Sequence, residues 1–201
     1  MPRVIYIVAT FCLLTFAPGA QADDFEDALN AYRAGDFAAA RAKFLTLSKD
    51  GDTRAMHNLA HMYRKGQSVK VDLDRAFKYF EYAAKQGFNL SQFQIARMYR
   101  RGQAVKANPE KALYWMRKAA NSKYARAQMT LGIWYDQGVG GPRDPVQAMM
   151  WHVIASSYAK GKMKKDIVER LAKLKEDLSH SQVAKAYRGS KKFLVNKRIF
   201  D

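Results

Sequence analysis

Residues 53–88 read TRAMHNLAHMYRKGQSVKVDLDRAFKYFEYAAKQGF, and the same pattern returns in residues 89–124 and 125–161. Five columns of similar residues recur in register, each at a spacing of 36 positions. The columns are Leu59/Ile95/Leu131, Tyr63/Tyr99/Tyr135, Gly66/Gly102/Gly138, Ala76/Ala112/Ala148 and Tyr79/Trp115/Trp151. A repeat of this length predicts a solenoid, in which the units stack and share one hydrophobic core.

Each unit has the pattern of two helices. In the first unit, apolar residues recur at helical spacing over 53–65 and again over 73–86, which predicts two amphipathic helices. Gly66 follows the first helix and suits a left-handed C-cap. Asp72 precedes the second helix, where its carboxylate can accept hydrogen bonds from free amides. The equivalent cap positions of the other units hold Gly102, Gly138, Asn108 and Asp144.

The repeat resembles the Sel1-like repeat, a branch of the tetratricopeptide superfamily. The residues that carry the resemblance in the first unit are Ala55, Leu59, Ala60, Tyr63, Gly66, Val69, Asp72, Ala76, Tyr79, Ala83, Ala84 and Gly87. The resemblance implies an all-α fold, an α/α superhelical solenoid of antiparallel helix pairs. It also implies an adaptor role in protein complexes, often in a bacterial envelope or secreted setting. The family has no shared catalytic residues, and this chain lacks the cysteines of its disulfide-bonded secreted members.

The N-terminus has the features of a secretory signal over residues 1–22. Arg3 supplies the positive charge, residues 4–17 are apolar, and the small residues before Asp23 fit a cleavage site after Ala22. We therefore expect a periplasmic or secreted protein whose mature chain begins at Asp23. The apolar run is short for a bilayer span, so we expect no transmembrane segment in the mature chain. An uncleaved membrane anchor is the alternative.

Loss of the signal would also remove Cys12, the single cysteine of the chain. The mature protein would then have no disulfide, no thiol catalysis and no cysteine ligand for a metal.

The remaining segments are predicted to cover the two ends of the stack. Residues 23–52 match a shortened unit and predict a tetratricopeptide-like capping hairpin with Asp36 as an N-cap. The three full repeats then occupy 53–161. Residues 162–189 predict two capping helices, the second of which opens with a capping box at Ser179 and ends at Gly189. Residues 190–201 predict a basic tail.

The chain is strongly basic. It contains 35 Lys and Arg residues against 18 Asp and Glu residues, which gives a formal net charge of +17. Such a charge favours anionic partners. For an exported protein these would be an acidic protein, lipopolysaccharide, phospholipid or peptidoglycan. Nucleic acid is not expected as a partner, because the signal would direct the chain out of the cytosol.

Part of this charge repeats with the units. Arg64 recurs as Arg100, and Lys70 recurs as Lys106. Stacked units would align these four residues as a basic edge beside the loops. This edge could bind an anionic envelope polymer such as lipopolysaccharide or peptidoglycan. The alternative is a solvated polar face that only keeps the protein soluble.

A second candidate surface is the groove that the first helix of each unit lines in related solenoids. The residues predicted to face it are Asn58, His61, Lys65, Gln94, Arg97, Arg101, Thr130, Ile133 and Gln137. Phe93 and Met129 flank it. The mixture of polar, basic and apolar side chains suits a peptide or helix of a partner protein. For Phe93, Met129 and Ile133 the alternative is packing between neighbouring units.

Two short patterns resemble parts of chemical sites. His57 and His61 are four residues apart and could face one metal ion on a helix, but the other repeats lack them and no acidic ligand is near. Ser157 and Lys160 match the S-x-x-K acylation motif without its companion motifs. We therefore predict no metal, no cofactor and no catalytic residue. The predicted function is a non-enzymatic scaffold of the bacterial cell envelope, with binding of an anionic polymer at the basic edge as the alternative.

Overall fold

The computed structural model describes residues 18–198, and all regular structure in this range is helical. Within the same range, no helix is both long enough and apolar enough to cross a membrane. The bounds are Pro18–Arg33 (α1), Phe37–Lys49 (α2), Thr53–Lys65 (α3), Leu73–Lys85 (α4), Asn89–Arg101 (α5), Pro109–Ala120 (α6), Ala125–Gln137 (α7), Pro145–Ser156 (α8), Gly161–Asp177 (α9) and His180–Arg198 (α10). The prediction of an all-α fold is confirmed.

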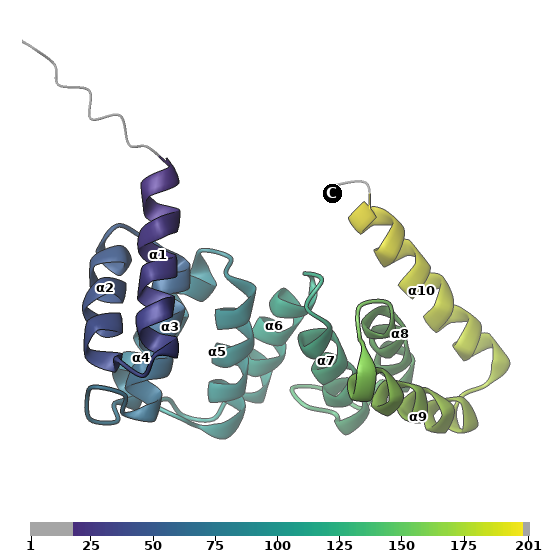
Figure 1. Cartoon of the computed structure of the whole chain (residues 1–201). Helices are drawn as coiled ribbons and strands as arrows, with labels where there is room; N and C mark the ends of the chain where they lie inside the picture. The colour runs from purple at the N-terminus through teal and green to yellow at the C-terminus, as the bar shows by residue number, and fades with distance from the viewer. Residues whose placement is uncertain (1–17, 199–201) are drawn as a thin grey trace, which may run out of the picture.

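Consecutive helices form pairs, and the pairs stack. Helix α1 packs on α2, α3 on α4, α5 on α6 and α7 on α8, while the second helix of each pair contacts the first helix of the next. Figure 1 shows the pairs following one another along an arc, with α1 at one end and α10 at the other. This arrangement is the antiparallel α/α solenoid that the 36-residue repeat predicts.

The predicted N-caps of the second helices are observed. Asp72 Oδ1 accepts a hydrogen bond from the amide of Arg75 at 2.8 Å. Asn108 and Asp144 make the same bond to the amides three residues on, at 2.8 and 2.9 Å. Gly66 ends α3 with a φ of 71°, a left-handed conformation that costs least for glycine. Local sequence thus fixes where these helices begin and end.

The hydrophobic core is shared between neighbouring repeats. One buried cluster joins Tyr63 and Phe80 of the first repeat to Ile95 of the second. Another joins Met116 of the second repeat to Trp134 of the third. Since each repeat completes the core of its neighbour, no repeat buries its apolar face alone.

Helices α1 and α2 cover the N-terminal end of the stack. Phe25 and Phe44 pack with Leu59 of α3 in one buried cluster, and Asp36 caps α2 through the amide of Ala39. Helix α1 already begins at Pro18, so the cleavage predicted after Ala22 would fall inside it. The rest of the predicted signal, residues 1–17, lies outside the described residues.

At the C-terminal end, the predicted capping box is observed. Gln182 Oε1 accepts a hydrogen bond from the Ser179 amide at 2.9 Å, and Ser179 Oγ accepts one from the Gln182 amide at 3.3 Å. Helix α10 follows at His180. Arg143 adds an ion pair to Asp177 at 2.9 Å, which ties the third repeat to the end of α9.

The prediction that the last helix ends at Gly189 is wrong, because α10 continues to Arg198. Residues 190–198 therefore belong to the helix, not to a tail. A Cβ atom at Gly189 would lie 2.7 Å from Met150 Sδ, so the glycine allows α10 to cross α8 closely. Beyond it, Phe193 packs edge-on against Trp151 at 5.2 Å between ring centroids. Burial of such side chains outweighs the roughly 1 kcal/mol that a glycine costs inside a helix.

Candidate functional site

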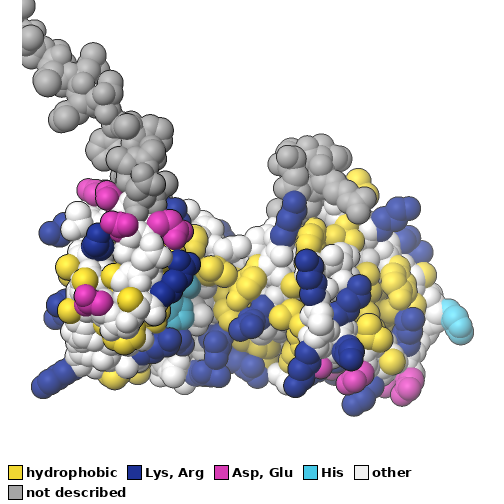
Figure 2. Space-filling model, in the orientation of Figure 1, with side chains coloured by type: hydrophobic (Ala, Val, Ile, Leu, Met, Phe, Trp, Pro, Cys, Tyr) yellow, Lys and Arg dark blue, Asp and Glu magenta, His cyan; other side chains and the backbone are white. Residues whose placement is uncertain are grey.

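The predicted groove residues lie on the first helix of each repeat, along α3, α5 and α7. We call this surface the first-helix face and define it by Asn58, His61, Lys65, Gln94, Arg97, Arg101 and Thr130, all of which are half-buried or exposed. In Figure 2, acidic side chains gather near α1 and at the lower edge by α9, whereas basic side chains spread over the region between them. The visible surface is hollowed between the two ends of the arc.

Between α5 and α7, this face contains a cavity of about 300 Å³, which we call the arginine pocket. It is lined by Phe93, Arg97, Arg100, Arg101, Arg126, Thr130 and Trp134. The structure thus brings three predicted groove residues together with Arg100 of the predicted basic edge. Arg126 and Trp134 were not predicted, because they lie outside the columns that the groove prediction used.

Two guanidinium groups in the arginine pocket lie over aromatic rings. The Arg97 guanidinium is 5.7 Å from the centre of the Phe93 ring, and that of Arg100 is 5.1 Å from the Trp134 ring. Arg100 Nη2 also donates a hydrogen bond to Gln137 Oε1 at 3.0 Å, which links the second and third repeats. These contacts hold the planar groups in defined orientations while leaving other N–H donors for a ligand.

The arginines of this region repel one another. The pKa of Arg97 is lowered first by burial and then by the positive charges of Arg101, Arg64 and Arg126. The pKa of Arg64 is likewise lowered by burial and by Arg101. The described lining of the pocket contains no carboxylate to offset these charges. The arrangement favours occupancy by an anion.

Beside the arginines, His57 and His61 form a directed hydrogen-bond chain. Arg64 Nη2 lies 2.9 Å from His61 Nδ1, which must accept because a guanidinium only donates. The neutral His61 ring then carries its proton on Nε2, which lies 3.2 Å from His57 Nε2. His57 therefore carries its proton on Nδ1, which lies 2.9 Å from Ser91 Oγ on α5. The chain connects the first repeat to the second.

Burial keeps these histidines neutral. Burial lowers the pKa of His57 to about 3, with further contributions from His61 and Arg64. Burial and the charges of Arg64, Lys65 and Arg97 lower the pKa of His61 to about 4. In α8, burial and Arg170 lower the pKa of His152 to about 4, against a small raising effect of Asp136.

These shifts predict that the protein loses stability in mild acid. Each of the three histidines stays neutral in the folded protein but takes up a proton near pH 6.5 when unfolded. Their full contribution is therefore present above pH 6.5 and is lost progressively as the pH falls to about 4 for His61 and His152 and to about 3 for His57. The loss should approach about 1.4 kcal/mol per pH unit for each histidine. Urea denaturation at pH 7.0 and 5.5 measures it, above the range where exposed carboxylates titrate.

The variant His61→Gln supplies the control. Glutamine keeps hydrogen-bonding groups at this position but does not titrate, so the difference in unfolding free energy between the two pH values should shrink. An unchanged free energy at pH 7.0 and 5.5 in the original protein would contradict the prediction.

The other predicted groove residues contribute less to this surface. Asn58 donates its side-chain amide to the Arg54 carbonyl within the same helix, and Gln94 is half-buried. Ile133 packs against the core cluster of the second and third repeats, and Met129 packs against a cluster that includes α9 residues. Phe93 is buried and meets Tyr124 edge-on at 5.4 Å. Ile133 and Met129 thus serve packing between units, which was the alternative interpretation, whereas Phe93 also lines the arginine pocket.

The four residues of the predicted basic edge lie at the ends of α3 and α5 and in the loops that follow them. Arg64 and Arg100 join the first-helix face, through His61 and the arginine pocket respectively. Lys70 and Lys106 are exposed in the loops that follow α3 and α5.

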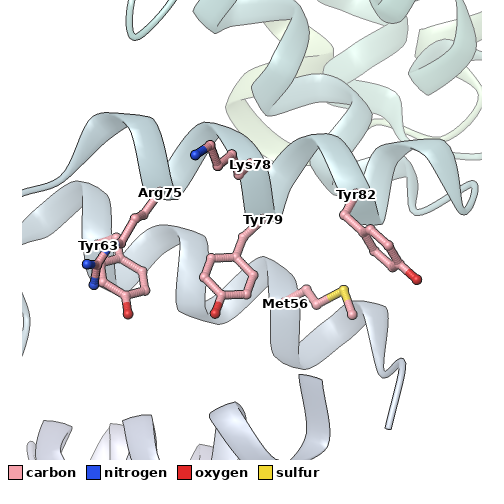
Figure 3. Close-up of a pocket in the computed structure, with 6 residues that line it drawn as sticks. All are labelled: Met56, Tyr63, Arg75, Lys78, Tyr79 and Tyr82. Atoms are coloured by element: carbon pink, nitrogen blue, oxygen red, sulfur yellow. The ribbon is translucent and has the colours of Figure 1, made fainter. Parts of the chain in front are cut away.

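A second cavity, of about 450 Å³, lies over α3 and α4 and was not predicted (Figure 3). The stacked rings of Tyr63 and Tyr79, 5.7 Å apart, form part of its wall. Arg75 lies over the Tyr63 ring at 5.5 Å, and Lys111 lies over Tyr99 at 5.6 Å in the next repeat. A cationic side chain thus lies over the tyrosine of this repeated column in both the first and the second repeat.

The two short patterns show no assembled chemical site. Within residues 18–198, no group of three or more His, Cys, Asp or Glu side chains is placed to hold a metal ion. Ser157 is the exposed C-cap of α8, and Lys160 precedes α9. The hydrogen bonds described for residues 18–198 do not join them.

Comparisons with known proteins agree with this architecture. The model of the Sel1 repeat matches residues 53–88, 89–124 and 125–157. A search of the curated proteins found no match.

Two solved structures show the same type of fold. The crystal structure of a Sel1 repeat protein from Oxalobacter formigenes is 26% identical, with a TM-score of 0.66, over 70% of this chain and 58% of that one. The structure of c5321, a protective antigen present in uropathogenic Escherichia coli strains and displaying an SLR fold, is 24% identical with a TM-score of 0.56. It aligns with 78% of this chain and 41% of its own, so this chain spans about half the length of these two proteins.

Proposed function

This chain belongs to the Sel1 repeat family, whose members are generally protein-interaction scaffolds, and on this basis we propose that it is a scaffold protein of the bacterial cell envelope. Its partner would be a protein with an acidic segment, held along the first-helix face. The chain would act without catalysis of its own and would reach the envelope by means of the signal in residues 1–22.

One observation carries the choice of this surface. Arg97, Arg101 and Arg126 converge on the first-helix face, and the described lining of their pocket offers no carboxylate. A soluble protein normally offsets such charges with nearby acidic groups, as Arg143 does here with Asp136 and Asp177. An acidic segment of a partner would supply the missing negative charge. Electrostatic attraction would also steer the partner towards this surface before contact.

The proposed export is compatible with the packing of α1. The predicted cleavage would retain residues from Asp23 onwards, including the buried Phe25 and Ala28. Those residues hold α1 against α2 and α3. An acidic partner is favoured over a polymer bound along one basic edge, because Arg97, Arg101 and Arg126 of the arginine pocket are not among the residues predicted for that edge.

Crosslinking in envelope extract tests the proposal with two charge-matched variants. Arg97→Glu/Arg101→Glu reverses two charges on the first-helix face, and should reduce recovery of the partner at least tenfold because each hydrogen bond to a charged group is worth about 1.5–3 kcal/mol. Lys70→Glu/Lys106→Glu makes the same change of net charge in the loops, and should leave recovery nearly unchanged. Mass spectrometry of the recovered chain also reads its N-terminus, which is expected at Asp23.

Equal recovery of the same partners by both variants would refute the first-helix face as the binding surface. Thermal unfolding of each variant shows beforehand that the solenoid is intact.

A further inference from the structure

We propose that the arginine pocket is a binding site for a phosphomonoester group. The site is formed by Arg97, Arg100 and Arg101 of α5 with Arg126 and Thr130 of α7. It shares Arg97, Arg101 and Arg126 with the surface proposed for the partner, but its binding of this small anion can be measured in the purified chain without a partner.

The charges in the pocket call for a ligand with more than one negative charge. Four guanidinium groups line a cavity of about 300 Å³, and the pKa of Arg97 is lowered by burial and by its positive neighbours. A carboxylate carries one charge and offers two oxygens on one edge. A phosphomonoester carries close to two charges at neutral pH and offers three terminal oxygens. It can therefore accept hydrogen bonds from arginines that approach from two different helices.

The geometry of the arginines also suits this ligand. Arg97 and Arg100 rest over the rings of Phe93 and Trp134, so their planar groups are oriented before the ligand arrives. Orientation of this kind lowers the entropy lost on binding. Guanidinium groups bind phosphate oxygens through paired N–H donors, which a lysine in the same place cannot do. The Thr130 hydroxyl donates its proton to the Arg126 carbonyl of its own helix, so the hydrogen bonds to phosphate would come from the arginines.

The volume of the cavity limits the size of the molecule to which the phosphate is attached. About 300 Å³ is at the small end of ligand pockets and exceeds the phosphate group itself. It has room for a phosphate joined to one sugar or to a lipid headgroup. A soluble sugar phosphate and a phosphorylated lipid present the same chemistry, and the experiment below separates them.

Isothermal titration calorimetry on the purified full chain at 150 mM salt tests the site, with glucose 6-phosphate as the soluble probe. Citrate and glucose are the comparison ligands, since the first has carboxylates only and the second has no charge. A flotation assay uses vesicles of neutral phospholipid with and without phosphatidic acid, which exposes a phosphomonoester. We expect saturable binding to at least one phosphomonoester probe, with weaker binding of citrate and none of glucose.

Substitutions in the arginine pocket test whether the phosphomonoester binds there. Arg97→Gln and Arg126→Gln should each weaken binding roughly ten- to one-hundred-fold, the effect of removing one charge-assisted contact. Arg97→Lys should give an intermediate loss, because it keeps the charge but not the paired donors. Lys70→Gln/Lys106→Gln removes two charges elsewhere and should have less than a threefold effect. Circular dichroism confirms that each variant retains its helical content.

The proposal is overturned if neither probe binds saturably, if citrate binds as tightly as the phosphomonoester, or if the Lys70/Lys106 variant loses as much affinity as the arginine variants. Failure here leaves the crosslinking result of the scaffold proposal unaffected, because that experiment measures a protein partner.

Discussion

Replacement of Gly140 by alanine is expected to destabilise the solenoid by roughly 3 kcal/mol. Gly140 lies in the loop before α8 with a φ of 74°, in the left-handed region. A Cβ atom there would overlap the Pro109 carbonyl oxygen and lie 2.9 Å from Leu113 Cβ, both in α6. The backbone carbonyl cannot move without displacing the start of α6, so the loop of the third repeat must lift away from the second.

Gly141 is the matched control, because a Cβ atom there meets nothing within 4 Å. Gly141→Ala should change the unfolding free energy by less than about 0.5 kcal/mol. Denaturation in urea measures both variants. Equal stability of the two would show that the contact between this loop and α6 does not hold the repeats together.

Replacement of Phe80 by alanine is expected to cost about 3–5 kcal/mol of unfolding free energy. Its side chain is fully buried in the core shared by the first and second repeats. Its ring also meets His57 and His61 edge-on, at 5.3 and 5.0 Å between centroids. The variant would leave a cavity beneath the hydrogen-bond chain, so water would reach both histidines and their pKa values should rise towards 6.5.

Tyr82 of the same helix is the control, since it is 52% exposed and outside this core. Tyr82→Ala should have a much smaller effect on the urea midpoint. Two-dimensional NMR of the histidine side chains follows the pKa change in the Phe80 variant. If both histidines remain neutral at pH 5 in that variant, burial by Phe80 is not the main cause of their low pKa values.

The division between repeated and varying positions has a functional meaning. Repeated residues such as Tyr63, Gly66 and Asp72 build the helices, the caps and the shared core. The first-helix face uses positions that differ between repeats, including His61 and Arg97, which occupy one column. A solenoid can in this way change its binding surface without changing its packing.

The sequence by itself determined the helices and their order. The caps at Asp72, Asn108 and Asp144, the glycine at Gly66 and the capping box at Ser179 were all predicted, because each depends on contacts within a few residues. The register of 36 residues also determined that the units stack, since a recurring apolar face must be covered by its neighbour. Arg97, Arg101 and Thr130 were assigned to one surface from helical spacing, together with the resemblance to related solenoids.

The tertiary structure decided which side chains of different helices lie next to one another. Gly189 looked like a helix end by local rules, and only the close crossing with Met150 shows why it stays inside α10. Arg100 was assigned to an edge by its column, yet the packing of α5 against α7 places its guanidinium over Trp134 in the arginine pocket. Sequence spacing gives the side of a helix on which a residue lies. The angle and distance between helices follow from side-chain packing across units, which no single segment of the chain contains.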